Sequence, residues 1–483
     1  MVFHEFTYLL FFLTVMTVYW CLPALWKNVL LILAGYLFYG WEKPWYTLLL
    51  GGTTVVDFFC ARAIGNTDDP LRKRRFLLIS IIANFTVLGC FKYLTFVLGN
   101  FRPLFPGVGP VISWWVGHIG LPAGVSFITF QNVGYVIDVY RGHTQARRSF
   151  IDYACFASFF PQLVAGPIER SANLLKQVER RRFPDLIAWR SGLLLILWGL
   201  FQKIVIADSA ALLANKVFSI GDPTFPVLWG GVIAFGVQIY ADFSAYTDMA
   251  RGSARLLGFD LLRNFNHPYL AQSPPEFWRR WHMTLSTWFR DYVYIPLGGS
   301  RSGPWKTARN LVITFFLSGL WHGASWNFVL WGLYHGVLVA GWPHLSSRLP
   351  LFGTAGGTFG TVFRVGLTFV LANVGWLLFR EQNLPMLLHD LALNPLAAPW
   401  DHWRLGAGIA AEALLYGLPL TVLLPLLQKW PFIGVHGAAN DHDPAAPIQW
   451  RLTALQACGA ALIIAAAVFL RCDVGSDFIY FQF

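Results

Sequence analysis

Charged residues are scarce in this chain: Asp, Glu, Lys and Arg make up 13% of its 483 residues, whereas 56% are hydrophobic. Ordinary globular domains carry about 25% charged residues. Apolar runs long enough to cross a hydrocarbon core of ~30 Å recur from one end of the sequence to the other. The composition therefore argues against a soluble domain and predicts a protein that crosses the lipid bilayer several times.

The sequence also lacks paired cysteines and a cleavable signal. No two of its six cysteines have the spacing of a metal site or a redox motif, so we expect neither a metal nor a disulfide framework. Residues 1–6 contain no Lys or Arg, so the basic segment of a secretion signal is missing and the first apolar run is predicted to be a retained span. The net charge of +11 is concentrated in loops between apolar runs, which favours a membrane over nucleic acid as the partner.

The apolar runs predict about ten membrane spans within a single membrane domain that covers residues 1–483. Residues 150–166 lie between basic clusters that we place in the cytoplasm, so this run is expected to be re-entrant. The sequence shows no internal repeat of the transporter type. The candidate spans cover residues 6–25, 28–40, 45–61, 76–98, 121–140, 186–207, 227–250, 311–341, 362–379, 408–428 and 453–470.

The segment 264–309 combines a helix signal with arginine and tryptophan residues. Ser273-Pro274-Pro275-Glu276 has the form of a helix start, with Ser as N-cap and Glu three positions later, and the helix is expected to run to about Tyr292. On such a helix Trp278 and His282 would share one face. One interpretation is an amphipathic helix at the cytoplasmic surface of the membrane.

A second interpretation of the same segment is a donor-binding site. Arg279, Arg280 and Arg301 would bind the phosphates of an acyl donor, because guanidinium groups bind phosphate in a bidentate way. The glycines of Gly298-Gly299-Ser300 would let backbone N–H groups approach the same phosphates. The sequence pattern is compatible with both interpretations.

His322 lies inside the apolar run 311–341. An ionised side chain within a membrane costs at least ~3 kcal/mol, so a histidine there is a candidate functional residue. If the span begins near Arg309, His322 lies roughly 20 Å into the bilayer, where a neutral imidazole suits a general base. The alternative is a histidine that only hydrogen-bonds a neighbouring helix. His335 is interpreted as structural, because on a continuous helix it would point away from His322.

Six short motifs stand at residues 165–170 (AGPIER), 276–286 (EFWRRWHMTLS), 289–299 (FRDYVYIPLGG), 319–323 (GLWHG), 332–336 (GLYHG) and 478–483 (FIYFQF). Taken together, they resemble the membrane-bound O-acyltransferase family. The resemblance is closer to its bacterial branch of alginate O-acetyltransferases and D-alanyl-lipoteichoic acid transfer proteins. The ending at residues 478–483 favours the acetylation members of this branch.

This resemblance implies a ring of about ten tilted transmembrane helices with re-entrant segments around a central funnel. It implies that His322 is the catalytic histidine and that His282 occupies a second family position, where Asn, Asp or His is found. The implied donor is a cytoplasmic thioester, acetyl-CoA or an acyl carrier protein, and no bound cofactor is expected. The residues expected to shape the substrate pocket or hold the oxyanion are Trp278, Trp321, Ser325, Trp326 and Asn327.

The implied enzyme lies in the inner membrane of a bacterium and serves the O-acetylation of an exported polysaccharide. Its direct acceptor would be a sugar hydroxyl or a serine of a separate periplasmic acyltransferase. The rival within the family is D-alanyl transfer to a cell-envelope polymer. A polysaccharide transporter or export channel would instead show paired intramembrane charges or inverted repeats. A non-catalytic scaffold would keep its function when His322 is replaced.

Overall fold

The structure is a computed structural model that describes residues 1–101, 107–118, 122, 124–164, 166–348, 357–423, 450–470, 475 and 478–479. Within these residues it consists of helices and loops without a strand, which confirms the predicted all-α class. The chain divides into two compact units. One is formed by Met1–Leu193 with Ala250–Leu262, and the other by Leu194–Met249 with Arg263–Phe483.

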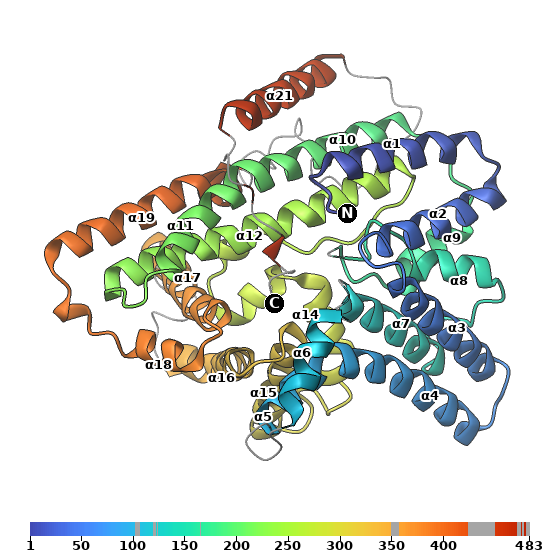
Figure 1. Ribbon diagram of the computed structural model, residues 1–483, viewed down its shortest axis with the longest axis horizontal. Coiled ribbons are helices and arrows are strands. Elements are labelled where there is room, and N and C mark those ends of the chain that lie inside the picture. The colour runs from blue at the N-terminus through green and yellow to red at the C-terminus, as the bar shows by residue number, and fades with distance from the viewer. Residues whose placement is uncertain are drawn as a thin grey trace. The chain divides into compact units, whose positions relative to one another are not determined.

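The first unit holds the N-terminal helices (Figure 1). Its helices are tied by polar contacts as well as apolar packing: the buried carboxylate of Asp57 accepts hydrogen bonds from Ser80 at 2.5 Å and Asn84 at 2.9 Å. A buried carboxylate needs such donors, so these bonds fix how α3 and α4 pair. The helices are α1 (Phe6–Cys21), α2 (Ala24–Tyr39), α3 (Tyr46–Gly65), α4 (Pro70–Leu88), α5 (Leu94–Phe101), α6 (Val108–His118), α7 (Val125–Tyr140), α8 (Phe150–Ala157), α9 (Lys176–Glu179) and the start of α10 (Leu186–Phe201).

The run at residues 150–166 does not cross the membrane as one helix. It begins with α8, which has 8 residues and therefore a length of about 12 Å, too short for a core of ~30 Å. Residues 158–164 then form turns. The re-entrant path expected for this run stays a prediction.

The second unit holds the candidate site residues. Helix α10 begins in the first unit and ends in the second, whereas α12 (Phe225–Leu256) begins in the second unit and ends in the first. The remaining helices of the second unit are α11 (Asp208–Phe218), α13 (Pro274–Arg280), α14 (Met283–Phe289), α15 (Pro304–His322), α16 (Trp326–Arg348), α17 (Gly357–Arg380), α18 (Leu384–Ala392), α19 (Trp400–Leu418) and α21 (Trp450–Phe469), with π-helical turns at Gln202–Ala207, Arg290–Tyr294 and Pro419–Leu423.

The apolar run 311–341 is a helical hairpin, α15 and α16, where a single span was predicted. The two helices approach so closely that a Cβ on Gly319 would lie 2.2 Å from the carbonyl oxygen of Phe328. Likewise, a Cβ on Gly332 would lie 2.5 Å from the carbonyl oxygen of Phe315. Small residues permit this close packing between helices in membranes. His322 therefore ends a helix instead of lying in the middle of one.

Five helical segments are long and apolar enough to cross a membrane within the described part of the chain: Tyr46–Gly65, Pro70–Asn100, Leu186–Phe218, Phe225–Leu256 and Gly357–Arg380. Shorter apolar helices cover Phe6–Cys21, Ala24–Tyr39 and Gly459–Phe469. The protein is therefore a multi-pass membrane protein, and the count of about ten spans stays a prediction. The predicted spans 121–140 and 408–428 reach residues 121, 123 and 424–428, which lie outside the described residues.

Candidate active site

His322 is the last residue of α15 and is 6% exposed. Its imidazole packs edge-on against the rings of Trp331 and Phe379, with centroid distances of 4.8 and 5.3 Å. The carbonyl groups at the C-terminal end of a helix carry partial negative charge and favour a nearby cation. The imidazole therefore lies in a buried, aromatic environment at the C-terminal end of a helix.

His282 lies where the predicted helix breaks. Ser273 caps the helix as predicted, accepting a hydrogen bond from the backbone N–H of Glu276 at 3.3 Å. The helix then ends at Arg280, and His282 takes a left-handed backbone conformation with φ 41° and ψ 55° before α14 begins. The expectation of one continuous helix to Tyr292 is therefore wrong. A left-handed conformation costs a residue with a side chain roughly 1–2 kcal/mol, so other contacts must hold this break.

Asn264 supplies those contacts. Its backbone carbonyl accepts a hydrogen bond from the N–H of Met283 at 2.8 Å. Its side-chain oxygen accepts one from the hydroxyl of Thr284 at 2.6 Å, and its amide donates to the hydroxyl of Thr247 at 3.3 Å. A strained backbone conformation persists only where contacts with the surrounding residues hold it in place. Asn264 thus fixes the position of His282 from a separate stretch of the chain.

The two candidate histidines meet at one indole. The ring of Trp321 lies 6.0 Å from His282 and 4.9 Å from His322, centroid to centroid. His282 is fully buried, and the ring of Phe243 packs against it at 4.7 Å. Burial lowers the pKa of His282 to about 3, so this imidazole is neutral at physiological pH. The structure therefore brings together three residues that the sequence singled out.

A cavity of about 230 Å³ is lined by residues of α13, α14, α15, α16 and the π-helical turn at Arg290–Tyr294, and the rings of His282, Trp321 and His322 are not part of its lining. Of the predicted binding residues, Trp278 and Arg279 line it. Ser318 also lines it, one helical turn before His322 on α15. The full lining is Pro275, Trp278, Arg279, Leu285, Ser286, Phe289, Arg290, Tyr294, Leu311, Thr314, Phe315, Ser318 and Val339. This is a mainly apolar cavity with two arginines.

The other predicted arginines lie elsewhere. Arg280 forms an ion pair with Glu276 at 2.7 Å, and Arg301 is exposed outside the cavity. The backbone N–H groups of Gly298 and Gly299 donate to carbonyl groups of the preceding turn at 3.0 and 2.9 Å. Because these amides are already engaged, they do not form the phosphate site that the sequence suggested. The two glycines instead adopt positive φ angles of 109° and 57°, which glycine tolerates because it has no Cβ.

Ser325, Trp326 and Asn327 stand at the start of α16 and outside the cavity lining. The amide of the buried Asn327 donates to the carbonyl groups of Leu378 and Phe379, both at 3.1 Å. These carbonyls belong to the last turn of α17, where carbonyl groups are commonly satisfied from outside the helix. Asn327 therefore supports the site by fastening the helix that carries Phe379, while Ser325 contacts Asn327 and Trp326 is 51% exposed.

Sequence reasoning missed Phe243, Asn264, Trp331, Phe379 and Arg290. The first four reach the histidines only through the fold, and no local pattern marks them. Arg290 carried a signal, since it lies in the arginine-rich segment 264–309 for which phosphate binding is one interpretation. Within the described residues no group of three or more His, Cys, Asp or Glu side chains could hold a metal ion.

The C-terminal motif reaches the same region. Phe478 is fully buried and stacks on Tyr246 with ring centroids 3.7 Å apart. It also lies 6.4 Å from Phe243, the ring that packs against His282. Residues 480–483 of the motif lie outside the described residues. The end of the chain is thus packed one ring away from the candidate site.

The fold and the site define a multi-pass membrane protein with two buried histidines beside an apolar cavity. The profile of the membrane-bound O-acyltransferase family matches residues 143–353. The chain is 36% identical to the probable alginate O-acetylase AlgI of Azotobacter vinelandii over 100% of both chains. It therefore belongs to the membrane-bound O-acyltransferase family and is an acyltransferase, as its motifs predicted.

Two further relatives carry other names. A peptidoglycan O-acetyltransferase of Helicobacter pylori is 34% identical over 76% of this chain and 73% of its own length. A teichoic acid D-alanyltransferase of Bacillus subtilis is 28% identical over 45% of this chain and 57% of its own length. The full-length similarity thus lies with an acetylating relative, and the D-alanylating relative matches a shorter part.

Proposed function

We propose that this chain transfers an acetyl group from a cytoplasmic thioester for the O-acetylation of an exported polysaccharide, with His322 as general base. It would act in the inner membrane of a bacterium. The observation that carries the proposal is the apolar cavity that reaches Ser318, one helical turn from the buried His322. The acetyl group and the polymer acceptor are suggested by relatives named alginate O-acetylase and peptidoglycan O-acetyltransferase.

The cavity suits a slender donor arm. Its volume of about 230 Å³ lies below the ~300–1,000 Å³ that is typical of pockets for whole small molecules. A thioester on a pantetheine arm would occupy it, and the phosphates would stay near Arg279 and Arg290, which are both exposed. CoA and acyl carrier proteins present the same arm, and acetyl-CoA is the donor that we would test first.

In the reaction, His322 would take the proton of the acceptor hydroxyl as its oxygen attacks the thioester carbonyl carbon. The C–S bond then breaks, and the leaving thiolate takes that proton from the imidazolium. General base catalysis of this kind contributes about 10²–10⁴-fold in rate. The C-terminal end of α15 would stabilise the imidazolium by about 0.3–1 kcal/mol, and by up to ~2 kcal/mol where the site is partly buried.

The direct acceptor is a sugar hydroxyl or a serine of a separate periplasmic acyltransferase. Both present the same chemical group to His322. An acceptor on the far side of the membrane requires that the acyl group meets it within the protein. The burial of His322 at the turn of the hairpin supports such a meeting point.

The test compares purified wild type, His322→Ala and His344→Ala, all with membranes that contain the native polymer. His344 is exposed on α16 and serves as the matched control for a lost histidine. We expect wild type and His344→Ala to release CoA from acetyl-CoA and acetylate the polymer, and His322→Ala to lose nearly all turnover. Turnover that survives in His322→Ala would overturn the role of this histidine.

D-alanyl transfer is the second candidate, because a teichoic acid D-alanyltransferase is among the relatives. The same three proteins are therefore incubated with D-alanyl carrier protein. Transfer from the carrier protein together with silence toward acetyl-CoA would replace the acetyl proposal by this one.

A further inference from the structure

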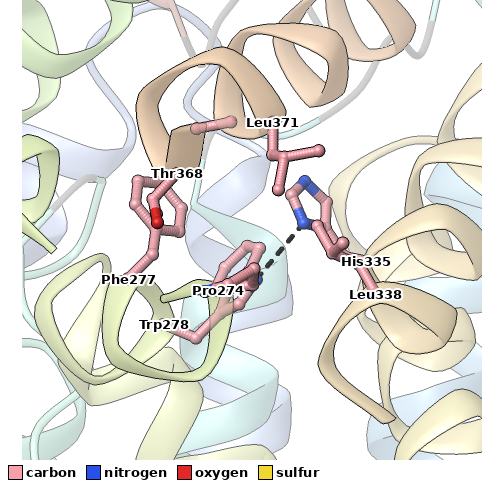
Figure 2. A pocket seen from close by; sticks show the side chains of 8 residues that line it. Pro274, Phe277, Trp278, His335, Leu338, Thr368 and Leu371 are labelled. Atoms are coloured by element: carbon pink, nitrogen blue, oxygen red, sulfur yellow. Dashed lines mark hydrogen bonds between the residues drawn. The ribbon is translucent and has the colours of Figure 1, made fainter. Parts of the chain in front are cut away.

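The indole of Trp278 separates two hollows. On one side it lines the cavity of about 230 Å³. On the other side it lines a small hollow of about 10 Å³, together with His335 and Thr368 (Figure 2). The complete lining of this hollow is Pro274, Phe277, Trp278, His335, Leu338, Thr368, Leu371 and Ala372. Trp278 is therefore a wall between the larger cavity and unused space behind it.

His335 holds this wall in place. The indole N–H of Trp278 donates a hydrogen bond to Nδ1 of His335 at 3.3 Å, and the two rings meet edge to face at a centroid distance of 5.0 Å. Figure 2 shows the imidazole nitrogen facing the indole across this bond. Because Nδ1 accepts, the ring is neutral and carries its proton on Nε2. A bond to a buried partner restricts the rotation of the indole.

The imidazole of His335 is itself fixed by its neighbours. A Cβ on Gly375 would lie 2.4 Å from Nε2 of His335, so the backbone of α17 passes against the ring. Trp331 covers another side at a centroid distance of 4.9 Å. The same Trp331 also contacts His322, at 4.8 Å. An indole thus lies against both histidines, and the contacts of His335 point to a role in positioning rather than proton transfer.

We propose that Trp278 limits the size of the acyl group that the cavity admits, and that His335 is the positioning residue for this wall. The ligand class is a short acyl chain on a thioester arm, and this identity rests on the proposed function. Removing the indole would join the hollow near Thr368 to the larger cavity. The joined space would then accept a longer acyl chain.

The size of the cavity can be measured without any donor. Ser318 lines the cavity, and Ser318→Cys places a thiol there. This variant is treated with ethyl and hexyl methanethiosulfonate, and adducts at position 318 are quantified by peptide mass spectrometry, with the native cysteines as internal standards. We expect the ethyl adduct to form and the hexyl adduct to form roughly tenfold more slowly, because an apolar pocket of limited size discriminates between added methylenes.

Three second substitutions in the Ser318→Cys background test the wall. Trp278→Ala opens it, His335→Leu removes the hydrogen-bond acceptor, and His335→Asn keeps an acceptor near the position of Nδ1. We expect the hexyl adduct to form at least about tenfold faster in the first two than in the parent, and at the parent rate in His335→Asn. Trp278→Phe serves if Trp278→Ala fails to give a monodisperse protein.

The outcomes separate the two parts of the proposal. Hexyl adducts that form equally in all four proteins would overturn the wall. Fast hexyl labelling in Trp278→Ala but not in His335→Leu would overturn the role of His335. Acyl-CoA donors of increasing length are then compared in the wall variants with Ser318 intact. Wild type that turns over no acyl-CoA would show that acetyl-CoA is wrong as the donor. If the expected hexyl adducts still form in the variants, the role of Trp278 as a wall of the cavity remains supported.

Discussion

The carboxylate of Asp242 on α12 accepts a 2.6 Å hydrogen bond from the backbone N–H of Ile479, near the end of the chain. The same carboxylate pairs with Lys203 at 3.1 Å, and Lys203 also pairs with Asp208 at 2.9 Å. The lysine side chain is fully buried. Buried charges of this kind must be paired, and Lys203 meets two carboxylates here. One of its carboxylates thereby fastens the C-terminal motif inside the second unit.

Asp242→Ala is therefore expected to release the end of the chain. Removing one partner of a buried ion pair costs about 3–5 kcal/mol, so the melting temperature should also fall. Asp208→Ala is the matched control, because it removes a charge beside Lys203 and leaves the bond to Ile479 intact. Carboxypeptidase should trim Asp242→Ala faster than Asp208→Ala. Equal trimming of the two variants would contradict the anchor.

The close approach of α15 and α16 predicts a second effect. A Cβ on Gly332 would lie 2.5 Å from the carbonyl oxygen of Phe315, so Gly332→Ala must push the hairpin apart. Such overpacking costs about 1–3 kcal/mol. Gly341→Ala in the same helix meets nothing within 4 Å and should be neutral or slightly stabilising. Melting temperatures in detergent check both, and an equal response of the two variants would show that the helices tolerate separation.

Local signals account for what the sequence could predict. The Ser273 cap depends on residues within one helical turn, and a membrane span depends on a contiguous apolar run. The structure contains both the cap and long apolar helices, as expected. The turn at His282 was not predictable, because Asn264 and Thr247 stabilise it from outside the predicted helix. Hydropathy also concealed the reversal after His322, since both arms of the hairpin are apolar.

Paired charges inside the protein do not by themselves distinguish a transporter from an acyltransferase. Paired intramembrane charges were expected of a transporter, and Lys203 does form such pairs with Asp208 and Asp242. The family shows that the protein is an acyltransferase, and the structure shows these charges holding the C-terminal motif. Sequence alone cannot distinguish a transport site from a structural ion pair. The distinction here depends on the second carboxylate oxygen of Asp242, which accepts a hydrogen bond from the backbone N–H of Ile479.

Glu169 predicts a dependence of stability on pH. Burial raises the pKa of Glu169 to about 7, although the backbone N–H of Leu262 and the amide of Asn173 donate to its carboxylate at 2.6 and 2.8 Å. Between pH 4.5 and about 7 the folded protein therefore binds more protons than the unfolded chain. Stability should fall as pH rises through this window, by up to about 3 kcal/mol, and change little above it.

Melting temperatures from pH 5 to 8 test this slope. Glu169→Gln should flatten it, because the replacement carries no titratable proton. Glu179→Gln should keep it, since Glu179 is exposed and pairs with the half-buried Arg147. A slope that survives in Glu169→Gln would assign the pH dependence to another group.

His282 combines a left-handed backbone with a neutral, buried ring. Asn tolerates φ near +41° far better than a β-branched residue does, so His282→Asn should fold while His282→Val should lose several degrees of melting temperature. Because burial holds the pKa of His282 at about 3, this residue does not titrate between pH 5 and 8. His282→Asn should therefore lower turnover and leave the shape of the pH–rate profile unchanged. A limb of the profile that disappears with His282 would show that its ring exchanges a proton during the reaction, and would place it beside His322 as a second acid–base group.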